Sequence, residues 1–176
     1  MTTSALIPCF QIMRKKIKPK AGQESVWDYP RPPRLEKTNK ALKIEFNGQV
    51  IAKSNRAYRV LETSHPPVYY IPQEDIYMDF LRKQEGRKTF CEFKGSAIYW
   101  DLFVNGKSVN NVAWSYPVPT NTFLPIQGYL AFYASKVDAC YVDGELVQSQ
   151  EGDFYGGWIT NDIVGPFKGG IGTWGW

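Results

Sequence analysis

The residues of this sequence best suited to acid–base chemistry are Glu62 and His65. Residues 58–63 are rich in Val, Tyr and Thr and predict a strand. On that strand Glu62 shares a face with Tyr58 and Val60, and a carboxylate among such neighbours finds a partner or has its pKa raised. His65 follows the strand, where exposed polar residues often line a site. Both are candidate general bases; the alternatives are a structural ion pair for Glu62 and a turn residue for His65.

Cys91 is the candidate nucleophile. It lies on a predicted strand with Glu92 and Lys94, and it shares a face with Phe93. A nucleophilic cysteine needs a base or a cation nearby to populate the thiolate. His65 is the available base, but the sequence identifies no third group to orient it, so an inert buried cysteine is the alternative.

Aromatic residues make up 15% of the chain, with six Trp and eleven Tyr. Rings that alternate with charged and polar residues on several predicted strands are typical of a pocket lined by a sheet, although a packed sheet core is the alternative. Stacking on Trp or Tyr contributes about 1–3 kcal/mol per base in nucleic-acid systems, so a nucleobase is a reasonable ligand. The predicted ligand contacts are Arg59, Tyr69, Tyr70, Glu92, Lys94, Trp100, Trp114, Tyr116 and Tyr133.

Asn-Gly and Asp-Gly pairs predict three β-hairpins, because both residues of a two-residue turn take positive φ. The turns are 47–48, 105–106 and 143–144. Two-residue loops would set Ile44 opposite Ile51, Ala97 opposite Trp114, and Tyr141 opposite Leu146. Large rings on both faces of the second hairpin predict a sheet that is covered on both sides.

A single short helix is predicted near residues 73–83. Pro72 suits an initial helical position, and acidic Glu74 and Asp75 complement the positive end of the helix dipole. The basic pair at 82–83 complements the other end. The predicted fold class is therefore mainly β, with antiparallel, folded-over sheets built from hairpins and this one helix.

The chain divides into two predicted parts. Residues 1–40 are expected to form an extended, basic, Pro-rich arm, and residues 41–176 a single β domain with an irregular C-terminal segment rich in Gly and aromatic residues. Residues 1–43 hold ten Lys/Arg against three Asp/Glu, and the remainder is net negative. Since a nucleic-acid-binding domain usually carries its basic patch on the folded body, nucleic acid is not a favoured partner.

Cysteine and histidine are too few and too scattered for common metal sites. Three cysteines without a CxxC pair and a single histidine predict neither a disulfide framework nor a zinc site, and we expect no metal and no cofactor. No apolar stretch approaches the roughly 20 residues that cross a bilayer, and no signal-peptide pattern is present. We expect a cytoplasmic protein without a membrane partner; the oligomeric state is left open.

Seven blocks of the sequence are specific in their combined order. They are Val60-Leu-Glu-Thr-Ser-His-Pro-Pro-Val-Tyr-Tyr-Ile-Pro72, Cys91-Glu-Phe-Lys-Gly-Ser-Ala-Ile-Tyr-Trp100, Ala113-Trp-Ser-Tyr116, Tyr129-Leu-Ala-Phe-Tyr133, Val137-Asp-Ala-Cys140, Asp143-Gly-Glu145 and Phe154-Tyr-Gly-Gly-Trp-Ile-Thr160. With these blocks the chain resembles, from about Trp27 to Trp176, the family catalogued as domain of unknown function 427. The resemblance implies a β-tent-like fold, with antiparallel sheets leaning together over a groove and one short helix.

The resemblance implies no reaction. Members of the family have been filed under nucleotidyltransferases, but this sequence lacks the paired acidic residues beside a Gly-Ser loop that metal-dependent nucleotidyl transfer needs. The sequence favours a domain that binds a small molecule or nucleotide in an aromatic-lined groove. One alternative is an enzyme, a hydrolase or a transferase that is nucleotidyltransferase-like, using Glu62 and His65 or Cys91. A protein-interaction scaffold is the third hypothesis.

Overall fold

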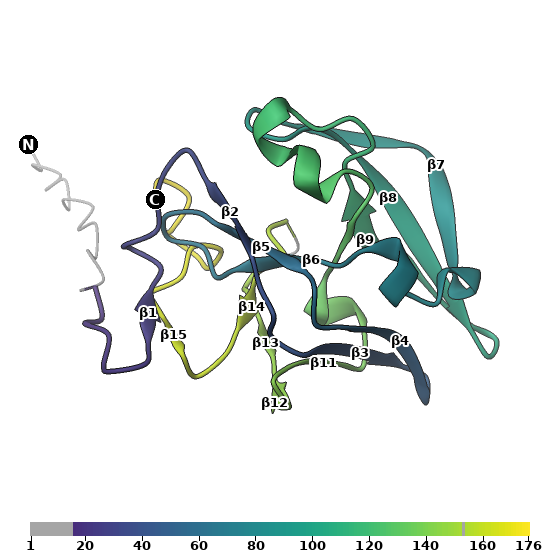
Figure 1. The fold of residues 1–176 in the computed structure, drawn as a ribbon, viewed down its shortest axis with the longest axis horizontal. Helices are drawn as coiled ribbons and strands as arrows, with labels where there is room; N and C mark the ends of the chain where they lie inside the picture. Colours follow the sequence, from purple (N-terminus) through teal and green to yellow (C-terminus); the bar gives the residue numbers. More distant parts are fainter. Residues whose placement is uncertain (1–15, 153) are drawn as a thin grey trace, which may run out of the picture.

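The computed structural model describes residues 16–152 and 154–176, and its fold is mainly β, as predicted. The longest strands form a four-stranded antiparallel sheet in the order β10-β9-β8-β7. Its strands are β7 (Leu81–Cys91), β8 (Gly95–Val104), β9 (Lys107–Ser115) and β10 (Leu130–Phe132). Figure 1 shows that β7, β8 and β9 lean over the rest of the molecule instead of closing into a barrel.

The other strands of the described residues form two further sheets and two short strand pairs. The sheet β12-β11-β3-β4 contains β3 (Leu42–Phe46), β4 (Gln49–Ser54), β11 (Ala139–Val142) and β12 (Glu145–Leu146). The sheet β2-β5-β6 contains β2 (Arg34–Lys37), β5 (Tyr58–Leu61) and β6 (Val68–Tyr70). The pairs are β13 (Gln148–Ser149) with β14 (Trp158–Ile159), and β1 (Glu24–Ser25) with β15 (Ile163–Val164).

The sheet β10-β9-β8-β7 carries a separate hydrophobic cluster on each face, which confirms the prediction that it is covered on both sides. One cluster contains Leu102 and Val112 and packs against Ile44 and Cys140 of the sheet β12-β11-β3-β4. The other contains the rings of Tyr99, Trp114 and Tyr116 and packs against β5, β6 and η3 (Asn121–Ile126). The second cluster is the one that borders the candidate site.

All three predicted hairpin turns are confirmed by positive φ at both turn residues, from Asn47-Gly48 to Asp143-Gly144. The third register, Tyr141 opposite Leu146, is also confirmed. The predicted register of the first hairpin is wrong by one residue. A bulge in β4 places Ala52, and not Ile51, opposite Ile44.

The second hairpin keeps its predicted register only near the turn. Further along, Trp114 lies opposite Tyr99 and not opposite Ala97, a shift of two residues. The cause is a bulge in β9 at Asn111, whose backbone N–H donates to Asp101 Oδ1 at 2.7 Å and whose φ is 52°. Because side chains alternate with period two, this shift leaves Tyr99 and Trp114 on their predicted common face.

The single helix predicted near residues 73–83 is wrong in extent and type. The structure has two short 3-10 helices, η1 (Gln73–Asp75) and η2 (Met78–Phe80), and Leu81 already begins β7. Between them Ile76 is extended and bridges Ala52 of β4. Long-range strand pairing therefore overrides the local helical signals. Another short 3-10 helix, η4 (Ala134–Lys136), lies between β10 and β11.

The two ends of the described chain lie together. β1 pairs in parallel with β15, and the Trp27 indole N–H donates to the Pro166 carbonyl at 3.0 Å. Figure 1 shows β1, β15 and the C-terminus on the same side of the molecule. Residues 1–15 of the predicted arm lie outside the described residues. None of the helices in the described part of the chain is long and apolar enough to cross a membrane.

Candidate functional site

A cavity of about 450 Å³ is bordered by the second hydrophobic cluster. Nine of the residues singled out from the sequence line it: Glu62, His65, Tyr70, Cys91, Glu92, Lys94, Trp114, Tyr116 and Tyr133. They come from the end of β5 and the loop after it, from β6, from the turn between β7 and β8, and from the ends of β9 and β10. Segments far apart in the sequence thus contribute to one hollow.

Three of the predicted ligand contacts do not line this cavity. Arg59 lies on the other face of β5, where its guanidinium donates to Glu24 and Glu36. Tyr69 packs against Trp158 in the first hydrophobic cluster, with ring centroids 5.3 Å apart. Arg59 and Tyr69 are each adjacent in sequence to a residue that lines the cavity. Because side chains alternate along a strand, Arg59 and Tyr69 point to the opposite face.

Trp100 is the third of these residues. Its indole N–H donates to Ser115 Oγ at 2.9 Å, and its ring packs against the first cluster, on the face of β8 opposite to Tyr99. Tyr99 lines the cavity in its place. Its hydroxyl is 2.9 Å from Thr89 Oγ1, and the Arg87 guanidinium lies 4.5 Å above its ring.

Buried aromatic side chains form the inner wall of the cavity. The Trp114 and Tyr133 ring centroids are 4.5 Å apart, and the Trp114 indole N–H donates to Tyr70 Oη at 3.2 Å. Tyr116 lies beside Tyr70, with ring centroids 6.3 Å apart. Burial raises the pKa of the Tyr70 and Tyr116 phenols, so both are neutral hydroxyl groups at neutral pH.

His65 presents a neutral imidazole to the cavity. Its Nδ1 is 2.9 Å from the Thr63 carbonyl oxygen, and its ring meets the Tyr155 ring edge-on at 4.6 Å. Burial lowers the pKa of His65. Because a carbonyl only accepts hydrogen bonds, Nδ1 carries the proton and Nε2 is left as an acceptor. His65 is one of the two candidate general bases, and Nε2 is the nitrogen of its ring that can accept a proton.

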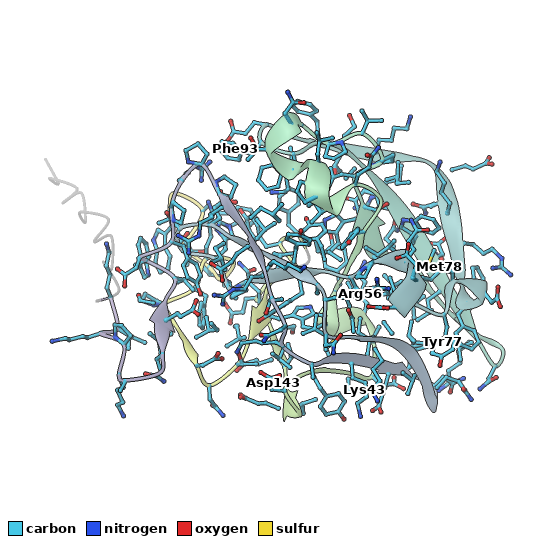
Figure 2. The ribbon with its side chains drawn as sticks, in the orientation of Figure 1. Lys43, Arg56, Tyr77, Met78, Phe93 and Asp143 are labelled. Carbon is cyan, nitrogen blue, oxygen red and sulfur yellow. The ribbon has the colours of Figure 1, made fainter. Side chains whose placement is uncertain are left out.

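The rim carries a charged bridge. Arg31 contacts the carboxylates of Glu62 and Glu92, each at 3.2 Å, and lies 5.5 Å above the Phe93 ring. Figure 2 shows Phe93, in the β7–β8 turn, on the side of the turn toward the loop that precedes β2. The ion pair that was the structural alternative for Glu62 is thus present, and it lies at the cavity itself.

Cys91 is a half-buried free thiol at the end of β7 and lines the same cavity as His65. The predicted nucleophile and a predicted base therefore share one hollow. Among residues 16–152 and 154–176, no group of three or more His, Cys, Asp or Glu side chains is arranged to hold a metal ion.

The family model described as Domain of unknown function (DUF427) matches residues 34–143. The chain belongs to this DUF427 family. No curated protein matches the chain. Belonging to DUF427 confirms the family that the sequence resembles, and the function of the domain has to be argued from its cavity.

The DUF427 match does not include every part of the cavity. Arg31 precedes it, and Phe154, Tyr155 and Lys168 follow it, yet all four line the cavity. Sequence reasoning missed Arg31 because it assigned that residue to the arm. Phe154 and Tyr155 stand in one of the blocks that carry the family resemblance, which was the available signal.

A second cavity, of about 410 Å³, lies on the sheet β12-β11-β3-β4. Lys43 and Arg56, which line it, are far from Phe93 in Figure 2. Arg56 forms an ion pair with Asp75 at 2.8 Å, and Lys43 forms one with Glu45 at 2.9 Å. The lining of this second cavity contains one aromatic ring. Of these two cavities, the first combines a wall of rings with the residues predicted to act as base and nucleophile.

Proposed function

We propose that this DUF427 domain binds one small organic molecule in the aromatic cavity. Its volume of about 450 Å³ falls within the range of roughly 300–1,000 Å³ that is usual for small-molecule sites. The wall combines apolar rings with a few polar groups, which is the usual composition of such sites. The concave placement of the rings favours a small ligand over a protein-interaction surface.

Two exposed rings at the cavity rim support this proposal. Phe90 is 77% exposed and Phe154 is 66% exposed, and both line the cavity. Covering apolar surface contributes about 25 cal/mol per Å² removed from water. A ligand that extends to the rim would therefore gain affinity by covering these two rings.

We expect the cavity-filling substitution Val68→Trp to abolish binding. Val68 lines the cavity and is half-buried, so an indole at this position occupies the space that the ligand needs. Native mass spectrometry of freshly purified protein would show a bound small molecule on the wild type and none on the variant. Circular dichroism checks that the variant is folded, since an added ring costs about 1–3 kcal/mol when it crowds a packed region.

The matched control is Val118→Trp, because Val118 is exposed and does not line the cavity. It should carry the same bound molecule as the wild type. Equal occupancy on the Val68 variant, or an empty wild-type protein, would count against the proposal.

An enzyme is the second candidate function, and the neutral His65 favours it. Its free Nε2 and the Glu62 carboxylate border the same cavity, so a base is available for hydrolysis or group transfer. Cys91 supplies a nucleophile in the same place. Like the first candidate, this function depends on a molecule entering the aromatic cavity.

If Glu62 acts as the base, Glu62→Gln should reduce turnover about 10²–10⁴-fold while leaving ligand affinity nearly unchanged. Hydrolysis of 4-nitrophenyl acetate and 4-nitrophenyl phosphate provides the assay, with binding of 4-nitrophenol as the affinity measurement. Glu85→Gln is the control, since Glu85 is exposed on β7 away from the cavity. Equal turnover by the Glu62 variant would mean that Glu62 is structural, and no turnover by the wild type would contradict the enzyme hypothesis.

A further inference from the structure

Lys94 is a buried lysine whose ammonium group has no anionic partner among residues 16–152 and 154–176. Its side chain lies in the turn between β7 and β8, is 8% exposed and lines the cavity. Its Nζ lies 5.5 Å above the Phe123 ring. No described residue forms an ion pair or a hydrogen bond with this Nζ. Lysine is almost never buried unless it is paired.

The carboxylates of the cavity are committed elsewhere. Glu62 and Glu92 both contact Arg31, which holds the pair at the rim. Glu92 is two residues from Lys94 in sequence, yet its carboxylate contacts the arginine and not the lysine. The Lys94 ammonium group is therefore not paired with either carboxylate of the cavity lining.

Five residues with charged side chains line the cavity. Arg31, Lys94 and Lys168 are cationic, and Glu62 and Glu92 are anionic. His65 is neutral because burial lowers its pKa. Lys168 Nζ donates to the main-chain oxygen of Trp176 at 2.6 Å. Lys94 therefore places a positive charge without a side-chain counterion beside apolar walls, and such a charge attracts anions.

Building on the proposed function, we infer that the ligand is a small aromatic anion. Its negatively charged group, a carboxylate or a phosphate, pairs with Lys94, and its ring lies against the wall formed by Trp114 and Tyr116. His65 lies in the same lining, and its Nε2 would accept a hydrogen bond from an N–H or O–H on that ring.

Two nearly isosteric probes, 2-naphthoate and 2-naphthamide, test this inference because they differ mainly in charge. Isothermal titration calorimetry would compare both on the wild type and on Lys94→Met, which keeps the length of the side chain and removes its charge. We expect the wild type to bind 2-naphthoate at least tenfold more tightly than 2-naphthamide. We expect the Lys94 variant to lose this preference while its affinity for 2-naphthamide stays unchanged, which also shows that its cavity is intact.

Lys83→Met is the matched control, because Lys83 is exposed on β7 and does not line the cavity. It should keep the preference of the wild type. Equal wild-type affinity for the two probes, or a preference that survives in the Lys94 variant, would overturn the anionic ligand but not the cavity as a binding site. Absence of binding by both probes, together with no molecule seen by native mass spectrometry, would overturn the proposed function itself.

Discussion

Replacing Gly156 with alanine should lower the free energy of unfolding by about 2–5 kcal/mol. The φ of Gly156 is 68°, a conformation that costs an L-residue about 1–2 kcal/mol. A Cβ atom placed there would lie 2.5 Å from Trp114 Cη2 and 3.1 Å from Tyr133 Cδ1. Both rings are buried in the cavity wall, so the added methyl group also overpacks the structure by about 1–3 kcal/mol.

Urea unfolding followed by circular dichroism would measure this loss. Gly175→Ala is the control, because a Cβ at Gly175 meets nothing within 4 Å and its φ is not positive. It should change stability by less than about 0.5 kcal/mol. A loss below about 1 kcal/mol for Gly156→Ala would mean that Trp114 and Tyr133 are not held by this close backbone approach.

Local sequence is sufficient to place the hairpin corners but not the registers that follow them. Asn47-Gly48 and Asn105-Gly106 favour positive φ by their own chemistry, without help from distant residues. The bulge at Asn111 depends instead on a hydrogen bond to Asp101 across the strand pair. No local sequence pattern predicts that contact. Beyond the bulge, the observed register of β8 and β9 therefore differs from the predicted one by two residues.

The predicted helix shows the same contrast between local and distant interactions. Asp75 suits a helix start, but in the structure it accepts hydrogen bonds from Ser54 and Arg56, which come from another part of the chain. Residues 82–83, which suit a helix end, pair with β8 in the sheet. Strand pairing and ion pairs with distant partners thus decide the conformation of this segment.

The candidate site was predictable where it depends on strand alternation. Trp114 and Tyr116 lie two residues apart at the end of β9, and both face the cavity, as residues of the same parity do. Tyr69 and Tyr70 are adjacent, and alternation alone does not say which of them faces the core between the sheets. That choice depends on the packing of Tyr69 against Trp158.

Arg31 and Lys168 could not be assigned to the site from sequence. They come from the segments on either side of the family match, and the parallel pairing of β1 with β15 brings those segments together. Lys168 is further tied to the loop after β5, since its backbone N–H donates to the Ser64 carbonyl. Parallel pairing of distant segments leaves no local mark in the sequence.

Stability should fall as the pH is lowered from 7 to 5, chiefly because of His65, the single histidine of the chain. Burial lowers its pKa below the ordinary value of 6.5. Below that value the unfolded chain binds a proton that the folded chain does not, so ΔG of unfolding rises with pH across this window. One proton corresponds to at most about 1.4 kcal/mol per pH unit.

His65→Gln should flatten this slope in urea unfolding series at pH 5, 6 and 7. The carboxyl groups with resolved shifts act at lower pH. A hydrogen bond from Arg56 lowers the pKa of Asp75, and at Asp162 burial is outweighed by hydrogen bonds from Lys40 and Thr160, so the pKa is again lowered. Their contributions are lost only as the pH falls below about 4. A wild-type slope that persists in the His65 variant would mean that this imidazole is not held neutral at the cavity.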